Sequence, residues 1–305
     1  MSDKFFDFMA YRRFAVIFSA ILLVVSLGSL AVNGLKLGLD FTGGSLVEVG
    51  YEQDANLNDI RDTLTSAGYE DVVVQTFGSP TDILIRLGAD HDPALGDKVL
   101  AALQAGEDQT ITLRRNEFVG AQVGEELREQ GGLGMLLALA MIMFYVAFRF
   151  QFKFSVGSVA ALAHDVIIVL GFFSVFQWEF DLTVLAAVLA VIGYSLNDTI
   201  VVSDRIRENF RIMRVGTPLE VINESINQTL GRTLVTSLTT LLVLIALAVF
   251  GGEMIHGFAL ALLVGVFVGT YSSIYVAANV LVMMNICKED LLPPPEEEEE
   301  EDDRP

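Results

Sequence analysis

The sequence is poor in cysteine, in charged residues and especially in basic residues. Its one cysteine, Cys287, excludes an internal disulfide and any metal site built from cysteines. Charged residues make up 19% of the 305 residues, against about 25% in soluble domains, while 52% are hydrophobic. The 19 basic residues are outnumbered by 39 acidic residues, which argues against binding to nucleic-acid phosphates. These shortages favour a membrane protein without a nucleic-acid partner.

Six apolar runs are long enough to cross a membrane. A helix needs about 20 apolar residues to cross a hydrocarbon core of about 30 Å. The first run lacks a following Ala-x-Ala cleavage site and is longer than the apolar part of a secretory signal, so we expect it to be retained. We predict six transmembrane helices, at residues 14–32, 131–148, 155–176, 184–202, 233–250 and 257–286.

Lysine and arginine are distributed unevenly among the loops. Basic residues near membrane spans accumulate on the cytoplasmic side. The short loops 177–183 and 251–256 contain none. The segments that alternate with them contain Lys4, Arg12, Arg13, Arg149, Lys153, Arg205, Arg207, Arg211, Arg214, Arg232, Lys288 and Arg304. We therefore predict a multi-pass protein with both termini in the cytoplasm and residues 33–130 on the outer side.

The outer segment alternates strand and helix patterns. Strands are expected at 45–51, 71–77, 82–87 and 109–118, and helices at 56–67 and 91–105. This βαββαβ order is typical of the ferredoxin-like fold. We therefore divide the chain into an N-terminus with the first transmembrane helix (1–32), an extracytoplasmic ferredoxin-like α+β domain (33–130), a five-helix membrane bundle (131–287) and a disordered acidic cytoplasmic tail (288–305).

A further helix is predicted in the loop before the fifth apolar run. Thr217, Pro218 and Glu220 are spaced as the N-cap, the first-turn proline and the glutamate of a capping box. Gly231 is expected to end this helix. We predict a cytoplasmic elbow helix near 218–230 on the membrane surface, because one of its faces is apolar and carries Leu219, Ile222, Ile226 and Leu230.

Polar side chains interrupt three of the apolar runs, where ionisable groups are costly and usually functional. Burial favours the neutral form of a carboxylic acid, whereas a nearby guanidinium favours its charged form, so a change in their distance can move protons. We predict that the ionisable and amide side chains have this proton-coupling role; they are His164, Asp165, Asn197, Asp198 and Arg232. The hydroxyls that follow Arg232 extend a polar seam through the bundle, at Thr233, Thr236, Ser237 and Thr240.

Simpler interpretations stay open at these positions. Asp198 and Arg232 could form a structural ion pair that sets helix register, and His164 could be a hydrogen-bonded partner instead of a proton carrier. The turn at 38–44 contains Asp40, Gly43 and Gly44 but lacks the lysine of a phosphate-binding loop, so we interpret it as a sharp link between membrane and domain. Neither a Ser-His-Asp arrangement nor a metal-ligand spacing is present, and we predict no catalytic residues, enzymatic activity, cofactor or metal.

Several motifs together resemble those of the SecF family. They are the turn Asp40-Phe41-Thr42-Gly43-Gly44, the triplet Ala163-His164-Asp165, the segment GYSLNDTIVVSDRIREN at 193–209 and the segment RTLVTSLTT at 232–240. The resemblance covers about residues 14–287, and the motif at 193–209 is highly specific. The acidic tail is outside it.

The resemblance implies a subunit of the bacterial inner membrane that assists the SecYEG channel together with SecD. Such a subunit uses proton flow to help complete the export of preproteins. Asp198 and Arg232 match residues tied to proton transport in that family, whereas Asp165 and Asn197 match motif positions with less definite roles. Two alternatives stay open: half of a proton-coupled small-molecule or lipid transporter, and a non-conducting assembly scaffold.

Overall fold

The computed structural model describes residues 6–69, 72–88, 92, 94–105, 109–149, 152–213, 216–287 and 290. It contains the six predicted helices that are long and apolar enough to cross a membrane. They are α1 (Arg12–Val32), α5 (Ala121–Arg149), α6 (Phe152–Phe176), α7 (Leu182–Ile212), α8 (Pro218–Phe250) and α9 (Glu253–Met283), and a short 3-10 helix, η1 (Met9–Tyr11), precedes α1. The predicted tail lies outside the described residues except for Asp290.

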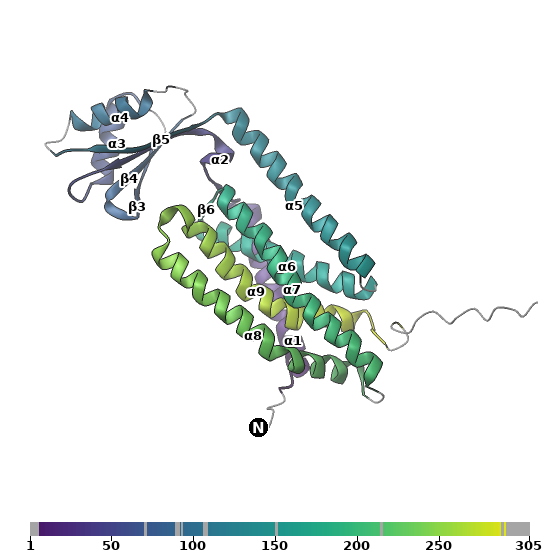
Figure 1. Ribbon diagram of the computed structural model, residues 1–305. Coiled ribbons are helices and arrows are strands. Elements are labelled where there is room, and N and C mark those ends of the chain that lie inside the picture. Colours follow the sequence, from purple (N-terminus) through teal and green to yellow (C-terminus); the bar gives the residue numbers. More distant parts are fainter. Residues whose placement is uncertain are drawn as a thin grey trace, which may run out of the picture.

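Helix α9 lies at the centre of the bundle, where it packs against α6, α7 and α8. Small residues allow this close approach, since a Cβ at Gly265 would lie 2.1 Å from a methyl of Val191 and one at Gly157 would lie 3.2 Å from the carbonyl of Ala277. Helix α5 runs along the edge of the bundle (Figure 1), where side chains such as Leu139, Ile142 and Val146 pack against the other helices. The polar residues discussed below therefore come mainly from helices that contact α9.

Several element boundaries differ from the sequence prediction, and two of them change the division of the chain. The boundary drawn at residue 130 falls inside α5, which begins at Ala121 because its charged first turns continue the helix beyond the apolar run. The prediction that Gly231 ends a separate elbow helix is wrong, because Gly231 keeps a negative φ and α8 continues through it to Phe250. The predicted capping box at Thr217 and Glu220 is present. The apolar face at Ile222 and Ile226 is buried against other helices.

The external domain has the predicted ferredoxin-like fold. Its elements are β2 (Gly44–Gly50), α3 (Leu57–Ser66), β3 (Val73–Phe77), β4 (Ser79–Leu87), α4 (Leu95–Gln104) and β5 (Thr112–Val119). The strands form one sheet in the order β3-β4-β2-β5, with every neighbouring pair antiparallel. Alternate residues of β2 and β4, including Val47, Val49, Ile83 and Ile85, are fully buried in a core with α3 and α4.

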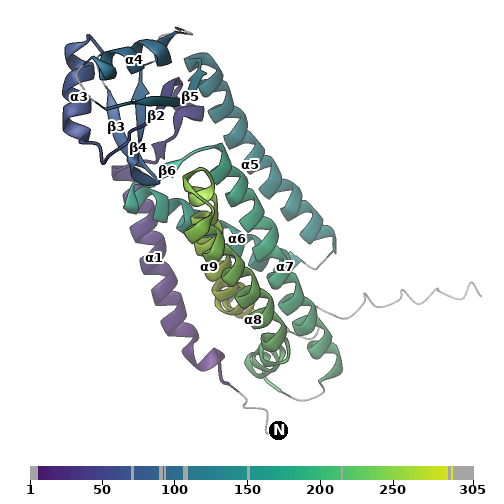
Figure 2. The same ribbon diagram turned by 60° about the vertical axis from the view of Figure 1, so that its left-hand side comes forward.

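The other face of the sheet is directed toward the membrane bundle, as Figures 1 and 2 show. Two short elements join the two parts. Strand β1 (Lys36–Leu37) follows α1 and pairs in parallel with β6 (Glu179–Phe180) in the loop between α6 and α7. The one-turn helix α2 (Leu39–Thr42) then leads into β2. The external domain is thereby held at the outer end of α7.

Candidate functional site

The predicted turn at Asp40, Gly43 and Gly44 lies at this junction. Asp40 accepts a hydrogen bond at its Oδ2 atom from the backbone N–H of Leu182, the first residue of α7, at 3.0 Å. Asp181 is the N-cap of the same helix and accepts from the N–H of Val184 at 2.8 Å. Two carboxylates therefore occupy the N-terminus of α7, where exposed N–H groups and the helix dipole favour negative charge.

The two glycines of this turn adopt backbone conformations that other residues disfavour. Gly43 has a φ of 69° and Gly44 a φ of 127°, both in the region that favours glycine. A Cβ on Gly44 would also lie 2.8 Å from the carbonyl oxygen of Leu87. The sequence interpretation of a sharp membrane-to-domain turn agrees with this geometry.

Further contacts fasten the turn to the bundle. The rings of Phe41 and Phe180 stack with centroids 5.9 Å apart. The guanidinium of Arg86 on β4 forms an ion pair with Glu179 on β6. The N–H of Gly38 donates to the carbonyl of Phe180 at 2.8 Å. A displacement of the external domain would consequently act on the start of α7, the helix that carries Asp198.

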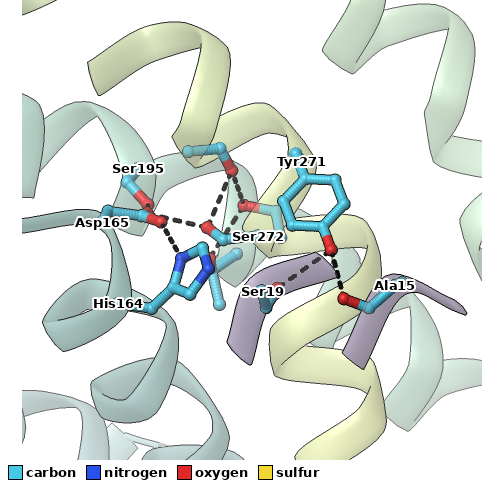
Figure 3. Close-up of polar contacts among 10 residues, drawn as sticks. Ala15, Ser19, His164, Asp165, Ser195, Tyr271 and Ser272 are labelled. Atoms are coloured by element: carbon cyan, nitrogen blue, oxygen red, sulfur yellow. Dashed lines mark hydrogen bonds and ion pairs between the residues drawn. The ribbon is translucent and has the colours of Figure 1, made fainter. Parts of the chain in front are cut away.

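Asp165 is the centre of a buried hydrogen-bond cluster in the bundle (Figure 3). Its side chain is 1% exposed. Its Oδ2 atom accepts from the hydroxyls of Ser195 at 2.5 Å and Ser272 at 2.7 Å, and its Oδ1 atom lies 2.9 Å from Nδ1 of His164. The cluster thus joins α6, α7 and α9. The Nε2 atom of His164 is buried without a hydrogen-bond partner among the described residues.

Asp198 lies on α7 one turn beyond Ser195, and it is buried with 4% exposure. The hydroxyl of Ser237 on α8 is 3.5 Å from its Oδ2 atom, a long contact. Ser237 also lies 2.7 Å from the hydroxyl of Thr270 on α9. The next residue of α7 after Asp198 is Thr199, whose hydroxyl shares a hydrogen bond of 2.9 Å with that of Ser273 on α9.

The predicted hydroxyl stripe on α8 divides between two environments. Thr233 and Ser237 are buried, and the hydroxyl of Thr233 has no hydrogen-bond partner among the described residues. Thr236 is exposed and Thr240 is half-buried. Their hydroxyls donate to backbone carbonyls of α8 itself, so these two residues do not join the buried seam.

Asn197 and Arg232 are both exposed. No ion pair within 4.0 Å links Arg232 to Asp198 among the described residues, so the structural ion pair considered from the sequence is not formed in this conformation. Arg232 instead lines a cavity of about 400 Å³ between α5, α7 and α8, together with Arg149, Asp204, Arg205 and Glu208. Of these residues, Arg205 is paired with Glu208 at 2.9 Å.

The sequence interpretation did not include the hydroxyls of α9. Thr270, Ser272 and Ser273 connect the surroundings of both carboxylates, and Gly269 lies beside them. A Cβ on Gly269 would lie 3.0 Å from that of Ser195 and 3.5 Å from Oδ2 of Asp165. The polar run Gly-Thr-Tyr-Ser-Ser inside an apolar span was the signal that could have identified them. Without the packing of α9, however, its partners were not predictable.

The arrangement has the components of a proton-handling site: two buried carboxylates, a buried imidazole and hydroxyls that can both donate and accept. A buried charge inside a membrane is costly unless it is paired or hydrogen-bonded, and Asp165 has three such partners whereas Asp198 has one long one. No group of three His, Cys, Asp or Glu side chains within the described part of the chain is placed to hold a metal ion.

Comparison with known proteins gives consistent matches. The family described as "Protein export membrane protein SecD/SecF, C-terminal" matches residues 99–286, and the "SecD/SecF GG Motif" matches residues 28–55. "Protein translocase subunit SecF" of Pseudomonas aeruginosa is 55% identical over 94% of this chain and 94% of its own length. The protein of the same name from Escherichia coli O157:H7 is 45% identical over 95% of this chain and 91% of its own length.

Solved structures agree with these matches. The crystal structure of SecDF, a translocon-associated membrane protein from Thermus thermophilus, has a TM-score of 0.85 and 39% identity over 93% of this chain. A second structure, of SecDF in a super-membrane-facing form, has a TM-score of 0.70 and 38% identity over 92% of this chain. In both cases the chain spans 39% of the length of the solved chain.

Proposed function

We propose that this chain, which belongs to the SecD/SecF family of protein-export membrane proteins and is similar to its SecF members, couples proton flow across the bacterial inner membrane to late steps of protein export. In this proposal it acts with SecD as an accessory subunit of the SecYEG channel. Its clients are exported preproteins, both of its termini are cytoplasmic, and it performs no enzymatic reaction.

One observation carries the proton part of the proposal: Asp198 is buried in an apolar bundle without a paired cation among the described residues, while Arg232 is exposed in the middle of the adjacent helix α8. Arg232 precedes Ser237, the hydrogen-bond partner of Asp198, by about 7.5 Å along α8. A modest shift of α8 along α7 would therefore change the distance between the guanidinium and the carboxylate.

That change of distance is a means of coupling. A nearby guanidinium favours the charged carboxylate, and its withdrawal favours the protonated form. Each proton that crosses a potential of 100 mV supplies about 2.3 kcal/mol, enough to shift a two-state helix arrangement. Asp165 is suited to a different role, because two of its three hydrogen bonds, from Ser195 and Ser272, link α6 to α7 and α9 in one arrangement.

The junction at Asp40 supports a route from these helices to the external domain. The start of α7 is hydrogen-bonded to the turn that leads into β2, so movement of α7 is transmitted to the sheet. A transporter half for a small molecule or lipid and a non-conducting scaffold are the rival functions. A scaffold would tolerate removal of the titrating group at Asp198, which makes that residue the decisive one.

The test replaces Asp198 by asparagine, which keeps the size and hydrogen bonding of the side chain but not its titration. Assembly with SecD is measured by copurification in mild detergent, and proton-driven export is measured in inverted membrane vesicles. We expect normal assembly and loss of the stimulation of export by the proton gradient. The matched control is Thr236→Val, an exposed position outside the buried seam. Full proton-dependent export by an assembled Asp198→Asn variant would contradict the proposal and favour the scaffold.

A further inference from the structure

One face of the external sheet is not covered by α3 and α4, and we call it the open face. A cavity of about 650 Å³ lies between this face and the outer end of the membrane bundle. The sheet side includes Gln75, Thr76, Phe77 and Leu84. The bundle side includes Trp178 in the loop before α7 and His256 near the start of α9. The walls therefore belong to both parts of the protein, so the dimensions of the cavity depend on the junction at Asp40.

The cavity reaches around the edge of β3. Thr76 lies opposite Ile83, whose side chain is buried on the helix-covered face, whereas Gln75 lies opposite Leu84 on the open face. Successive side chains of a strand point to opposite faces. Three consecutive residues, Gln75, Thr76 and Phe77, nevertheless all line the cavity. Its wall at this point is consequently the edge of the strand, not one face of the sheet.

The outer side of β3 is an edge of the sheet as far as the described strands go. Strand β3 is the last strand of the sheet, and within the described part of the chain β4 is the strand that pairs with it. The N–H and C=O groups along its outer side are spaced as another strand requires. Such a row recognises an extended polypeptide backbone largely independently of its sequence.

The surrounding side chains suit a polypeptide better than a lipid. Phe77 of β3 packs against a buried apolar cluster that includes Leu46 and Leu84, and its half-buried ring would contact a side chain of a strand added beside β3. Charged groups line the rest of the cavity, and acidic residues outnumber basic ones among them: Asp40, Glu117, Glu179 and Asp181 against Lys36 and Arg115. A mixed lining of this kind accommodates alternating apolar and polar side chains.

We propose that this cavity binds an extended segment of an exported polypeptide, which adds as a strand to the edge of β3. The inference rests on the proposed function in export, and it specifies where the external domain binds its client. Because residues 33–130 carry 18 acidic and 7 basic residues, segments rich in lysine or arginine would bind most tightly. Binding of this type would couple occupancy of the cavity to the position of the external domain above α7.

The first test measures binding directly, with the full chain in lipid nanodiscs. The probe is a fluorescein-labelled heptapeptide of alternating lysine and valine, followed by fluorescence anisotropy. Its control is the same peptide N-methylated at four consecutive central residues, which removes backbone donors from both of its edges. We expect at least tenfold weaker binding of the methylated peptide. Equal binding of the two peptides would show only electrostatic attraction and would overturn strand addition.

Matched protein variants locate the site. Thr76→Cys and Thr65→Cys, each in a Cys287→Ser background, place a thiol at an exposed threonine on the edge of β3 or on α3. Alkylation with a bulky maleimide should abolish binding of the unmethylated peptide at position 76 and leave it unchanged at position 65. Binding that survives modification at position 76 would overturn the proposed location.

A second test uses living cells, with a photo-crosslinking amino acid at position 76 or 65 and an exported chain arrested in transit. We expect crosslinks to the arrested chain at position 76 at least tenfold above position 65. Crosslinks mainly to SecD or to a second copy of this chain would assign the cavity to subunit contact and overturn the proposal. Peptide binding does not depend on proton flow, so its failure is distinguishable from a negative result with Asp198→Asn.

Discussion

Asp40 accepts a hydrogen bond from the backbone N–H of Leu182, 142 residues later in the chain, at a distance of 3.0 Å. This bond joins the turn at the base of the external domain to the first residue of α7. Asp198 lies further along the same helix. The contact therefore links the part of the protein outside the membrane to the helix that carries a buried carboxylate.

Replacement of Asp40 by alanine should weaken this link. The N–H of Leu182 would lose its acceptor, and loss of a capping acceptor costs about 1 kcal/mol. Asp40→Asn keeps an acceptor oxygen and should lose less. We expect Asp40→Ala to lower the unfolding temperature in detergent and to reduce export while SecD is still bound. Identical behaviour of the alanine and asparagine variants in both measurements would contradict a capping role.

Gly44 should not tolerate a side chain. Its φ of 127° is unfavourable for other residues, and a Cβ would lie 2.8 Å from the carbonyl oxygen of Leu87. Gly44→Ala is expected to cost about 1–3 kcal/mol in the free energy of unfolding. Gly132→Ala is the matched control, because a Cβ at that position would meet no side chain or neighbouring element of the described chain within 4 Å. The unfolding temperatures of the two purified variants are compared. Equal temperatures would contradict the prediction that position 44 excludes a side chain.

Asp165 and Asp198 should respond differently to neutralisation. Asp165→Asn disturbs three hydrogen bonds, at 2.5, 2.7 and 2.9 Å. A hydrogen bond contributes about 0.5–1.5 kcal/mol, so we expect a total loss of about 2–3 kcal/mol from the three bonds. Asp198→Asn disturbs one contact of 3.5 Å and should cost less than about 1 kcal/mol. Thermal unfolding measures the loss of stability in each variant. An equal loss in the two variants would contradict a structural role for Asp165 that Asp198 does not share.

The C-terminal end of the described chain should loosen in acid. Asp290 accepts from Nζ of Lys153 at 2.6 Å and from the N–H of Cys287 at 2.9 Å. These contacts lower the pKa of Asp290 from 3.8 to about 2. Because the folded pKa lies below the unfolded one, the stabilisation is complete above about pH 5 and is lost as the pH falls toward 2.

The thiol of Cys287 reports this change, since it lies 3.1 Å from Oδ2 of Asp290 and is the sole cysteine in the sequence. Its reaction with dithiodipyridine, a reagent active in acid, should accelerate as the pH falls from about 5 to about 3. Asp290→Asn should react rapidly across the whole range. A wild-type rate that is independent of pH would exclude this contact as an anchor of the segment.

The orientation in the membrane is also testable. The uneven distribution of arginine predicts that Gly78 lies outside and Arg211 inside. Cysteines introduced at these positions in a Cys287→Ser background are treated with an impermeant maleimide in spheroplasts. We expect labelling at position 78 alone, and at both positions after permeabilisation. Labelling of position 211 in intact spheroplasts would reverse the predicted topology.

Local and periodic features of the sequence determined much of this protein. Six apolar runs specify six membrane helices, since backbone polar groups in lipid must be satisfied within the helix itself. Alternating residues such as Val47 and Val49 specify a strand with an apolar face, which the core buries, and the βαββαβ order specifies the sheet topology. Helix ends were less well determined. Gly231 had the residue type of a helix terminus but not the required positive φ, because the residues on both sides continue the helix.

Tertiary structure alone decided which polar residues meet. Thr233 and Thr236 are neighbours in one stripe of the sequence pattern, yet one is buried and the other exposed, because only one side of α8 packs against the bundle. Ser272 became a partner of Asp165 through the packing of α9 against α6, which no periodicity within either helix specifies. The bond between Asp40 and Leu182 likewise joins segments far apart in the chain. Such contacts depend on the rotation and the relative depth of whole helices, which follow from packing and not from local sequence.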